Sequence, residues 1–312
     1  MKVICLGILV ADVIGRPIDA IPAAGALALV PSITPHIGGC AANTGIGLQM
    51  LGATTVVAGK VGNDGFGEFV RAELEKSGAQ TAISVDAATP TSATMVLVQS
   101  DAERAFLHCT GANATFEMGD FNASLLDGAD LLHIAGHGLM PRFDGAQCAE
   151  ILRMAREKGV KTSLDTAGAP DENWCHNLRT CLPFLDYFVP SLHEVQHLFP
   201  DEKSPEALAT RLLKMGVGVV ALKMGERGSF VTDGETSHFV PPFHVEAVDA
   251  TGAGDAFAAG FLAGVLNGFS LEASAQLGNA AGALVVTQVG TSAGYRSLSA
   301  TLEWIKTQST NP

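Results

Sequence analysis

The chain alternates short runs of apolar residues with longer stretches in which apolar residues recur at helical spacing. Strands buried on both faces read as continuous apolar runs, so this alternation is typical of a parallel sheet covered by helices. The runs predict buried strands at Val3–Val10, Thr54–Ala58, Leu131–Ala135, Lys161–Leu164, Tyr187–Val189 and Val217–Leu222. The stretches between them predict helices at Ala42–Leu51, Gly65–Lys76, Ala146–Lys158, Ser191–Leu198, Pro205–Met215, Asp255–Leu266 and Leu271–Thr287.

Two stretches interrupt this rhythm. Asp12–Ile37 is rich in Pro and Ala and has no helical period. Thr91–Cys109 holds two extended runs around a polar turn, which predicts a hairpin. Both should lie outside the α/β core and form a small accessory sheet together. Gly228–Val240 also predicts short antiparallel strands. Because no repeat or linker divides the chain, we expect a single domain over residues 1–312, with a core at 1–11, 38–90 and 111–312 and a β lid at 12–37 and 91–110.

Composition narrows the class of protein. Of the 312 residues, 47% are hydrophobic and 16% charged, which excludes disordered, collagen-like and coiled-coil chains. The net charge of −13, without a Lys/Arg cluster, argues against nucleic acid and an anionic membrane surface as partners. Six cysteines without C-x-x-C spacing indicate reduced thiols in a cytoplasmic protein. Residues 20–59 carry no Asp, Glu, Lys or Arg, but prolines and glycines break that run, so no membrane helix is expected.

The most informative segment runs from Val248 to Asp255, Val-Asp-Ala-Thr-Gly-Ala-Gly-Asp, and leads directly into a predicted helix. Gly252, Ala253 and Gly254 would let backbone amides approach a ligand at a helix N-terminus, where partial positive charge favours a phosphoryl group. Asp255 would stand at the helix start as a proton acceptor for a hydroxyl. The alternative is a glycine-rich turn in which Asp255 is an ordinary N-cap.

A second segment begins with Gly38-Gly39-Cys40-Ala41-Ala42-Asn43. Paired glycines before a helix can admit a sugar against the backbone, and the Asn43 amide offers both donors and acceptors to hydroxyls. By itself such a segment is more often only a turn.

Together the two segments resemble the PfkB, or ribokinase-like, family of carbohydrate kinases over essentially the whole chain. Gly38, Gly39 and Asn43 fit the family's G-G-x-x-x-N signature, and Asp249–Asp255 fits its D-x-x-G-A-G-D signature. The resemblance implies a mainly parallel sheet with helices on both faces and a small β-sheet lid. It also implies that Asp12 holds sugar hydroxyls. Nucleotide contacts are implied for the following residues: Lys223, Gly225, Gly228 and Asn279.

The chain departs from the family in three places. Ser191-Leu192-His193-Glu194 keeps the Glu of the family's N-x-x-E but replaces its Asn. Cys40 stands where ribokinases carry Lys. His137 lies near their sugar-binding Glu, where it is either a sugar contact or strand-end packing. Preference for a sugar other than ribose is therefore expected.

The resemblance implies ATP-dependent phosphorylation of a primary hydroxyl of a small sugar or sugar derivative, with Asp255 as general base. Mg²⁺ would be arranged by Glu194 through water. K⁺ would bind beside the glycine loop Gly252–Gly254, here also called the anion loop, through Asp249 and Thr251. A homodimer would form through the lid. A nucleoside kinase of this fold, with Phe106 or Phe116 stacking on a base, is one alternative. A sugar-binding relative without catalysis is another.

Overall fold

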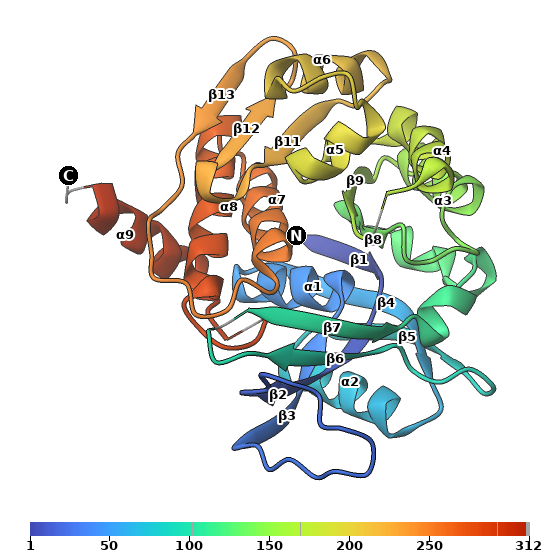
Figure 1. Cartoon of the computed structure of the whole chain (residues 1–312). Coiled ribbons are helices and arrows are strands. Elements are labelled where there is room, and N and C mark those ends of the chain that lie inside the picture. The colour runs from blue at the N-terminus through green and yellow to red at the C-terminus, as the bar shows by residue number, and fades with distance from the viewer. Residues whose placement is uncertain (102, 169, 292, 310–312) are drawn as a thin grey trace.

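The computed structural model describes residues 1–101, 103–168, 170–291 and 293–309. Its larger sheet has the strand order β13-β12-β11-β10-β9-β8-β1-β4-β5 (Figure 1). Seven neighbouring strands of this sheet are parallel: β1 (Lys2–Gly7), β4 (Thr54–Gly62), β5 (Gln80–Asp86), β8 (Leu131–His137), β9 (Lys161–Thr166), β10 (Tyr187–Phe188) and β11 (Val219–Lys223). The antiparallel strands β12 (Ser229–Thr232) and β13 (Ser237–Val240) close one edge, as their sequence predicted.

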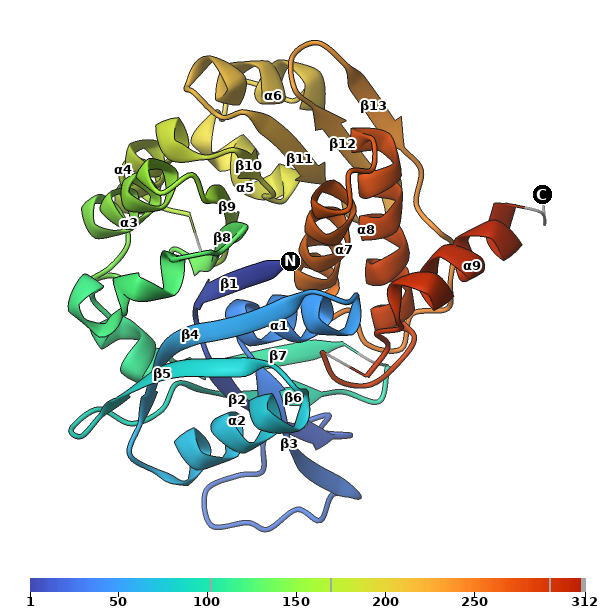
Figure 2. The ribbon, with the colours of Figure 1, turned by 180° about the vertical axis from the view of Figure 1, so that it is seen from behind.

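Helices cover both faces of the sheet, and each face has its own hydrophobic core. One face carries α1 (Cys40–Met50), α2 (Gly65–Lys76), α7 (Ala253–Leu266), α8 (Leu271–Val286) and α9 (Leu298–Ser309). The other carries α3 (Ala146–Glu157), α4 (Glu172–Cys181), α5 (Leu192–Leu198) and α6 (Pro205–Lys214), so the two sets flank the sheet in Figure 2. The predicted α/β class is confirmed.

A separate sheet of four strands lies beside this core, with the order β3-β2-β6-β7. Its strands are β2 (Val10–Arg16), β3 (Ser32–Gly38), β6 (Ala93–Val98) and β7 (Arg104–Cys109). β6 and β7 form the predicted hairpin, and β2 pairs in parallel with β6. We call these four strands the small sheet; they lie along one side of the main sheet in Figures 1 and 2.

One expected strand is in fact two. The apolar run Val3–Val10 breaks after Gly7, and β2 starts at Val10 and enters the small sheet. Gly7 packs against the next strand so closely that a Cβ there would lie 1.8 Å from the carbonyl oxygen of Ala135. Asn113 holds the connection from the other side: its amide nitrogen donates to the Leu9 carbonyl at 3.0 Å, and its oxygen accepts from the Leu9 N–H at 3.1 Å. The chain therefore crosses from core to small sheet at a fixed point.

No helix in the described part of the chain is long and apolar enough to cross a membrane.

Candidate active site

The glycine loop, Gly252–Gly254, forms the N-terminus of α7. Gly252 is the N-cap, with φ of 80° in the left-handed region, where a side chain would be strained. The helix starts at Ala253, earlier than expected, so Asp255 is its third residue and not its cap. The Ala253 N–H donates to the Ala250 carbonyl at 3.3 Å. Because first-turn amides lack acceptors within their own helix, those of Gly254 and Asp255 remain for an anion.

The Asp255 carboxylate is buried, with 9% of the residue exposed. Asn43 Nδ2 donates to its Oδ2 at 2.8 Å. The Cys40 thiol lies beside the same carboxylate and favours its charged form. Burial raises the pKa of Asp255, although the bond from Asn43, the Cys40 thiol and the charge of Lys223 oppose that rise. A carboxylate with a raised pKa is a better proton acceptor near neutral pH than an exposed one.

Cys40 is a partner of Asp255 that the sequence analysis did not foresee. Burial, followed by the charge of Asp255, raises the pKa of the Cys40 thiol well above its usual value. Cys40 therefore stays a neutral hydrogen-bond donor, whereas a Lys at this position would bring a positive charge. Its signal in the sequence was its position between Gly39 and Asn43 in the first motif.

Four predicted sugar-site residues gather at the junction of the small sheet and α1, and one of them, Asn43, contacts Asp255. Gly39 has φ of 91°, and a Cβ there would lie 2.4 Å from the Ile8 carbonyl oxygen. The Asp12 carboxylate packs directly on Gly38, where a Cβ would lie 2.0 Å from its Oδ2. Asn43 Oδ1 is buried and has no hydrogen-bond partner in the described part of the chain. An acceptor atom is thus left free beside Asp255.

Asp12 shares the electrostatic field of this cluster. Burial is the main reason that the pKa of Asp12 is raised to about 6, and the charges of Asp249 and Asp255 raise it further. A hydrogen bond from Thr94 acts in the opposite direction.

A buried ion pair borders the loop on its other side. Lys223 Nζ donates to both Asp165 carboxylate oxygens, at 2.7 and 2.6 Å. Burial would lower the pKa of Lys223, but the charges of Asp165, Glu194 and Asp255 outweigh it and raise the pKa. A Cβ on Gly254 would lie 3.3 Å from Lys223 Nζ, so the ammonium stands at the entrance to the loop. Sequence reasoning missed Asp165, which no motif marks.

Ser191 and Glu194 form a capping box at the start of α5, which explains the replaced Asn. The Ser191 hydroxyl accepts from the Glu194 N–H at 3.2 Å, and Glu194 Oε2 accepts from the Ser191 N–H at 2.8 Å. Ser191 therefore takes over an N-cap role, and the Glu194 carboxylate remains close enough to Lys223 and Asp255 to influence their pKa values.

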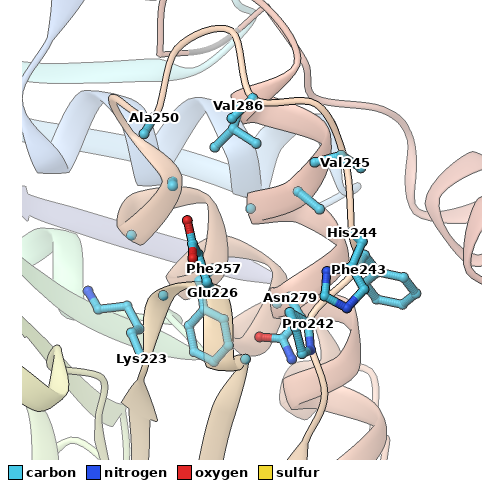
Figure 3. A pocket seen from close by; sticks show the side chains of 18 residues that line it. Lys223, Glu226, Pro242, Phe243, His244, Val245, Ala250, Phe257, Asn279 and Val286 are labelled. Atoms are coloured by element: carbon cyan, nitrogen blue, oxygen red, sulfur yellow. The ribbon is translucent and has the colours of Figure 1, made fainter. Parts of the chain in front are cut away.

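A cavity of about 510 Å³ adjoins the loop (Figure 3). Lys223 lies on one side of it, and Phe243, His244 and Asn279 lie on the other. All four predicted nucleotide contacts line this cavity: Lys223, Gly225, Gly228 and Asn279. The Asn279 amide nitrogen already donates to the carbonyls of Val240 and Pro241, at 3.1 and 2.9 Å, so it fixes the cavity wall. The volume and the apolar lining suit a flat heterocycle.

His137 does not join the site. A register shift between Ala135 and His137 turns its ring toward α3 and α4. The side chain is fully buried there, with Nε2 3.8 Å from both Cys181 Sγ and Asp144 Oδ1. The sugar contact considered for His137 is therefore corrected to strand-end packing. Phe116 is likewise buried, packed edge-on against Phe143 with ring centroids 5.1 Å apart, and is not available to stack on a base.

The oxygens expected to hold potassium face a side chain in this structure. Arg104 Nη1, from the first residue of β7, donates to both Asp249 Oδ1 and Thr251 Oγ1. The expected cation pocket at Asp249 and Thr251 thus contains a guanidinium. The sequence offered only a weak signal for this contact, an Arg within the predicted hairpin.

The glycine loop, the buried Asp255 and the adjacent cavity lie together in one site, and comparisons with known proteins identify the class of enzyme. The chain belongs to the pfkB family of carbohydrate kinases, whose pattern matches residues 1–297. It is 28% identical to the 2-dehydro-3-deoxygluconokinase of Bacillus subtilis (85% of each chain) and 31% identical to the ATP-dependent ribose-1-phosphate kinase of Halopiger xanaduensis (88% of each). An Escherichia coli ribokinase II solved with ATP and Mg²⁺ shares the fold, with a TM-score of 0.86 and 24% identity over 98% of this chain and 99% of that one. The expected class, an ATP-dependent sugar kinase, is thereby confirmed.

Proposed function

We propose that this kinase transfers the γ-phosphoryl group of ATP to a primary hydroxyl of a small sugar or sugar derivative. The observation that carries the proposal is the position of Asp255, held by Asn43 and Cys40 in the first turn of α7 and bordered by the cavity. Asp255 takes the hydroxyl proton, the hydroxyl oxygen forms its bond to the γ-phosphorus, and ADP leaves. The amides of Gly252 and Gly254 would stabilise the charge on the transferring group, and that of Ala253 would join them on leaving the Ala250 carbonyl.

The acceptor would bind on the small-sheet side of Asp255. Asn43 Oδ1 is a buried acceptor without a protein partner, and a sugar hydroxyl would satisfy it. Gly38 lets the Asp12 carboxylate pack directly on the backbone, and that carboxylate would accept from further hydroxyls. The Cys40 thiol in place of a cation, and a buried His137, lead us to expect an acceptor other than ribose.

The nucleotide would occupy the 510 Å³ cavity, with its phosphates toward Lys223 and the loop. The residues present fit a magnesium ion that keeps most of its waters, because the Glu194 carboxylate lies within the field of Lys223 and Asp255. When bound, the ion would neutralise charge on the nucleotide phosphates. The solved relative with ATP and Mg²⁺ supports this assignment.

An acceptor screen tests the proposal. Purified protein with ATP and Mg²⁺ is offered pentoses, hexoses, deoxy-keto sugar acids, sugar 1-phosphates and nucleosides, and ADP formation is followed. The names of two relatives, a 2-dehydro-3-deoxygluconokinase and a ribose-1-phosphate kinase, justify including both acidic classes. We expect one sugar class to dominate. If ribose is the best acceptor, our interpretation of Cys40 is wrong. If a nucleoside is the best acceptor, the protein is a nucleoside kinase and the proposed sugar-kinase function is wrong.

We further propose a homodimer through the small sheet. One face of this sheet exposes three large apolar side chains, Ile33 (64%) on β3, Met95 (53%) on β6 and Leu107 (56%) on β7. Met95 and Leu107 are direct neighbours across β6 and β7. A second copy would cover this apolar face. Six free cysteines also fit the proposal of a reducing, cytoplasmic environment.

A further inference from the structure

The Asp249 carboxylate holds the anion loop in place through hydrogen bonds. Its Oδ2 accepts from the Gly290 N–H at 3.0 Å, and its Oδ1 accepts from the Thr251 N–H at 2.9 Å. The N–H groups of Val248 and Asp249 in turn donate to the Val286 carbonyl at 2.7 and 3.0 Å. One carboxylate thus ties the segment before α7 to the segment after α8, and the position of Gly252 and Gly254 depends on it.

This carboxylate lies in a strongly negative neighbourhood. Asp249, Asp12 and Asp255 are close enough for the first and third to raise the pKa of the second. The Asp249 side chain is only 11% exposed, so water gives it little compensation. A buried carboxylate among like charges needs a counter-charge. Removing the counter-charge lowers stability by more than the ion pair contributes, because it leaves the carboxylate buried and unpaired.

Arg104 supplies that charge from a different part of the fold. It is the first residue of β7, and Nη1 reaches both Asp249 Oδ1 and Thr251 Oγ1 while its side chain is 21% exposed. Among the ion pairs of the described residues, this is the one that connects the small sheet to the anion loop. A guanidinium donates several hydrogen bonds in a fixed plane, which suits simultaneous contact with a carboxylate and a hydroxyl.

We propose that Arg104 is the built-in cation of the anion loop: it takes the place of a monovalent cation from solution and couples the loop to the small sheet. The proposal deepens the proposed kinase function and rests on it. Arg104 is a positioning residue, because it acts through Asp249 and Thr251 and not on the substrate. The kinase should then work equally well without potassium, and the loop should take its working position only while β7 is in place.

The test compares the wild-type enzyme with Arg104→Ala in potassium and in tetramethylammonium at equal ionic strength. Wild-type turnover should be the same in both. The variant should lose roughly 10- to 100-fold in tetramethylammonium, the scale of a displaced catalytic loop, and potassium or dilute guanidinium should restore a large part of it. Arg153→Ala is the matched control and should show neither effect. It breaks the exposed ion pairs of Arg153 with Glu150 and Glu157 on α3.

Thermal unfolding provides a readout that needs no acceptor. Potassium should raise the Tm of Arg104→Ala by roughly 2–4 °C and leave the wild-type Tm unchanged. Adding Asp249→Asn to that variant should abolish the shift. Arg104→Lys, which keeps a charge, should fold and remain independent of potassium. This measurement separates the Arg104 proposal from the proposed kinase function, because it can be made even if no acceptor is found.

Potassium activation of the wild-type enzyme would overturn the proposal, because the site would then need an outside cation despite Arg104. The absence of any potassium effect on both turnover and Tm of a folded Arg104→Ala variant would also overturn it.

Discussion

Asp255 gains its proposed role from neighbours that lie far away in the sequence. Asn43 is 212 positions earlier, and Cys40 belongs to the same turn of α1. Burial pushes the carboxylate toward its neutral form while these two donors favour its charged form. This balance holds it ready to accept a proton at neutral pH. The two motifs predicted the participating residue types, but only the packing of α1 against α7 shows that Cys40 is one of them.

Asp255→Asn tests this role directly. The amide keeps the shape of the side chain but cannot take the hydroxyl proton, so turnover should fall by at least about 10²-fold while nucleotide affinity stays within a few-fold. Steady-state kinetics with the acceptor found by the screen, together with nucleotide titration by calorimetry, measures both. Asp201→Asn, at an exposed position paired with Arg211, is the control. Near-normal turnover of Asp255→Asn would exclude it as the base.

Asp12 should show a stability cost that depends on pH. Its pKa is about 6 in the folded protein against 3.8 for the free group, so the fold disfavours the charged form. The favourable contribution is present below pH 3.8 and is lost as pH rises through about 6. Asp12→Asn should therefore stabilise the protein by about 1–3 kcal/mol at pH 8, from 1.36 kcal/mol per pKa unit, and by less at pH 4.5.

Denaturant unfolding at several pH values decides this prediction. The stability gain of Asp12→Asn should increase from pH 4.5 and level off above about pH 7. A gain that does not change with pH would show that burial does not disfavour the charged form of Asp12. The same variant should bind the acceptor more weakly, because its side chain accepts fewer hydroxyl hydrogen bonds.

At the scale of elements, the pattern of apolar residues predicted the long core elements and failed where the chain turns sharply. α2 matches its predicted bounds, Gly65–Lys76, because Asp64 caps its first turn and an amphipathic face follows. The expected strand Val3–Val10 was wrong, since an apolar run does not reveal that Gly7 and the Asn113 clamp divide it between two sheets. β5, α4 and α9 were missed: β5 is mostly half-exposed and α9 has a weak helical period, whereas α4 is amphipathic and was overlooked.

The start of α1 depends on Gly39, and Gly39→Ala tests it. Its φ of 91° is unfavourable for any side chain, and the new Cβ would lie 2.4 Å from the Ile8 carbonyl oxygen. We expect a loss of about 1–3 kcal/mol in unfolding free energy, the scale of a strained backbone position. Acceptor binding should weaken as well, because α1 carries Cys40 and Asn43.

Gly65→Ala is the matched control for that measurement. Gly65 begins α2, and a Cβ there would meet no atom within 4 Å. Because Ala favours a helix more than Gly does, this change should be neutral or stabilising by up to about 1 kcal/mol. Equal losses in both variants would mean that Gly39 is not a special position.

At the scale of the whole molecule, the order of the motifs predicted the architecture. It did not predict the ion pair between the small sheet and the anion loop. The accessory sheet was predicted from the hairpin at Thr91–Cys109 and the irregular stretch before Ile37, and both contribute strands to it. The contact of Arg104 with Asp249 joins positions 145 residues apart and has no local pattern. Such contacts arise only where two sheets meet, and for that reason a single sequence does not show them.

The exposed face of the small sheet leads to the last prediction, which concerns the assembly. Met95 and Leu107 lie opposite each other on β6 and β7, and both are more than half exposed. If a second copy covers them, Leu107→Glu places a charge inside an apolar interface and should convert a dimer to a monomer in light scattering coupled to size exclusion. Phe239→Glu, at a residue 55% exposed on the edge strand β13, is the control and should remain a dimer. A monomeric wild-type protein at micromolar concentration would rule out the proposed dimer, because the apolar side chains would then face water.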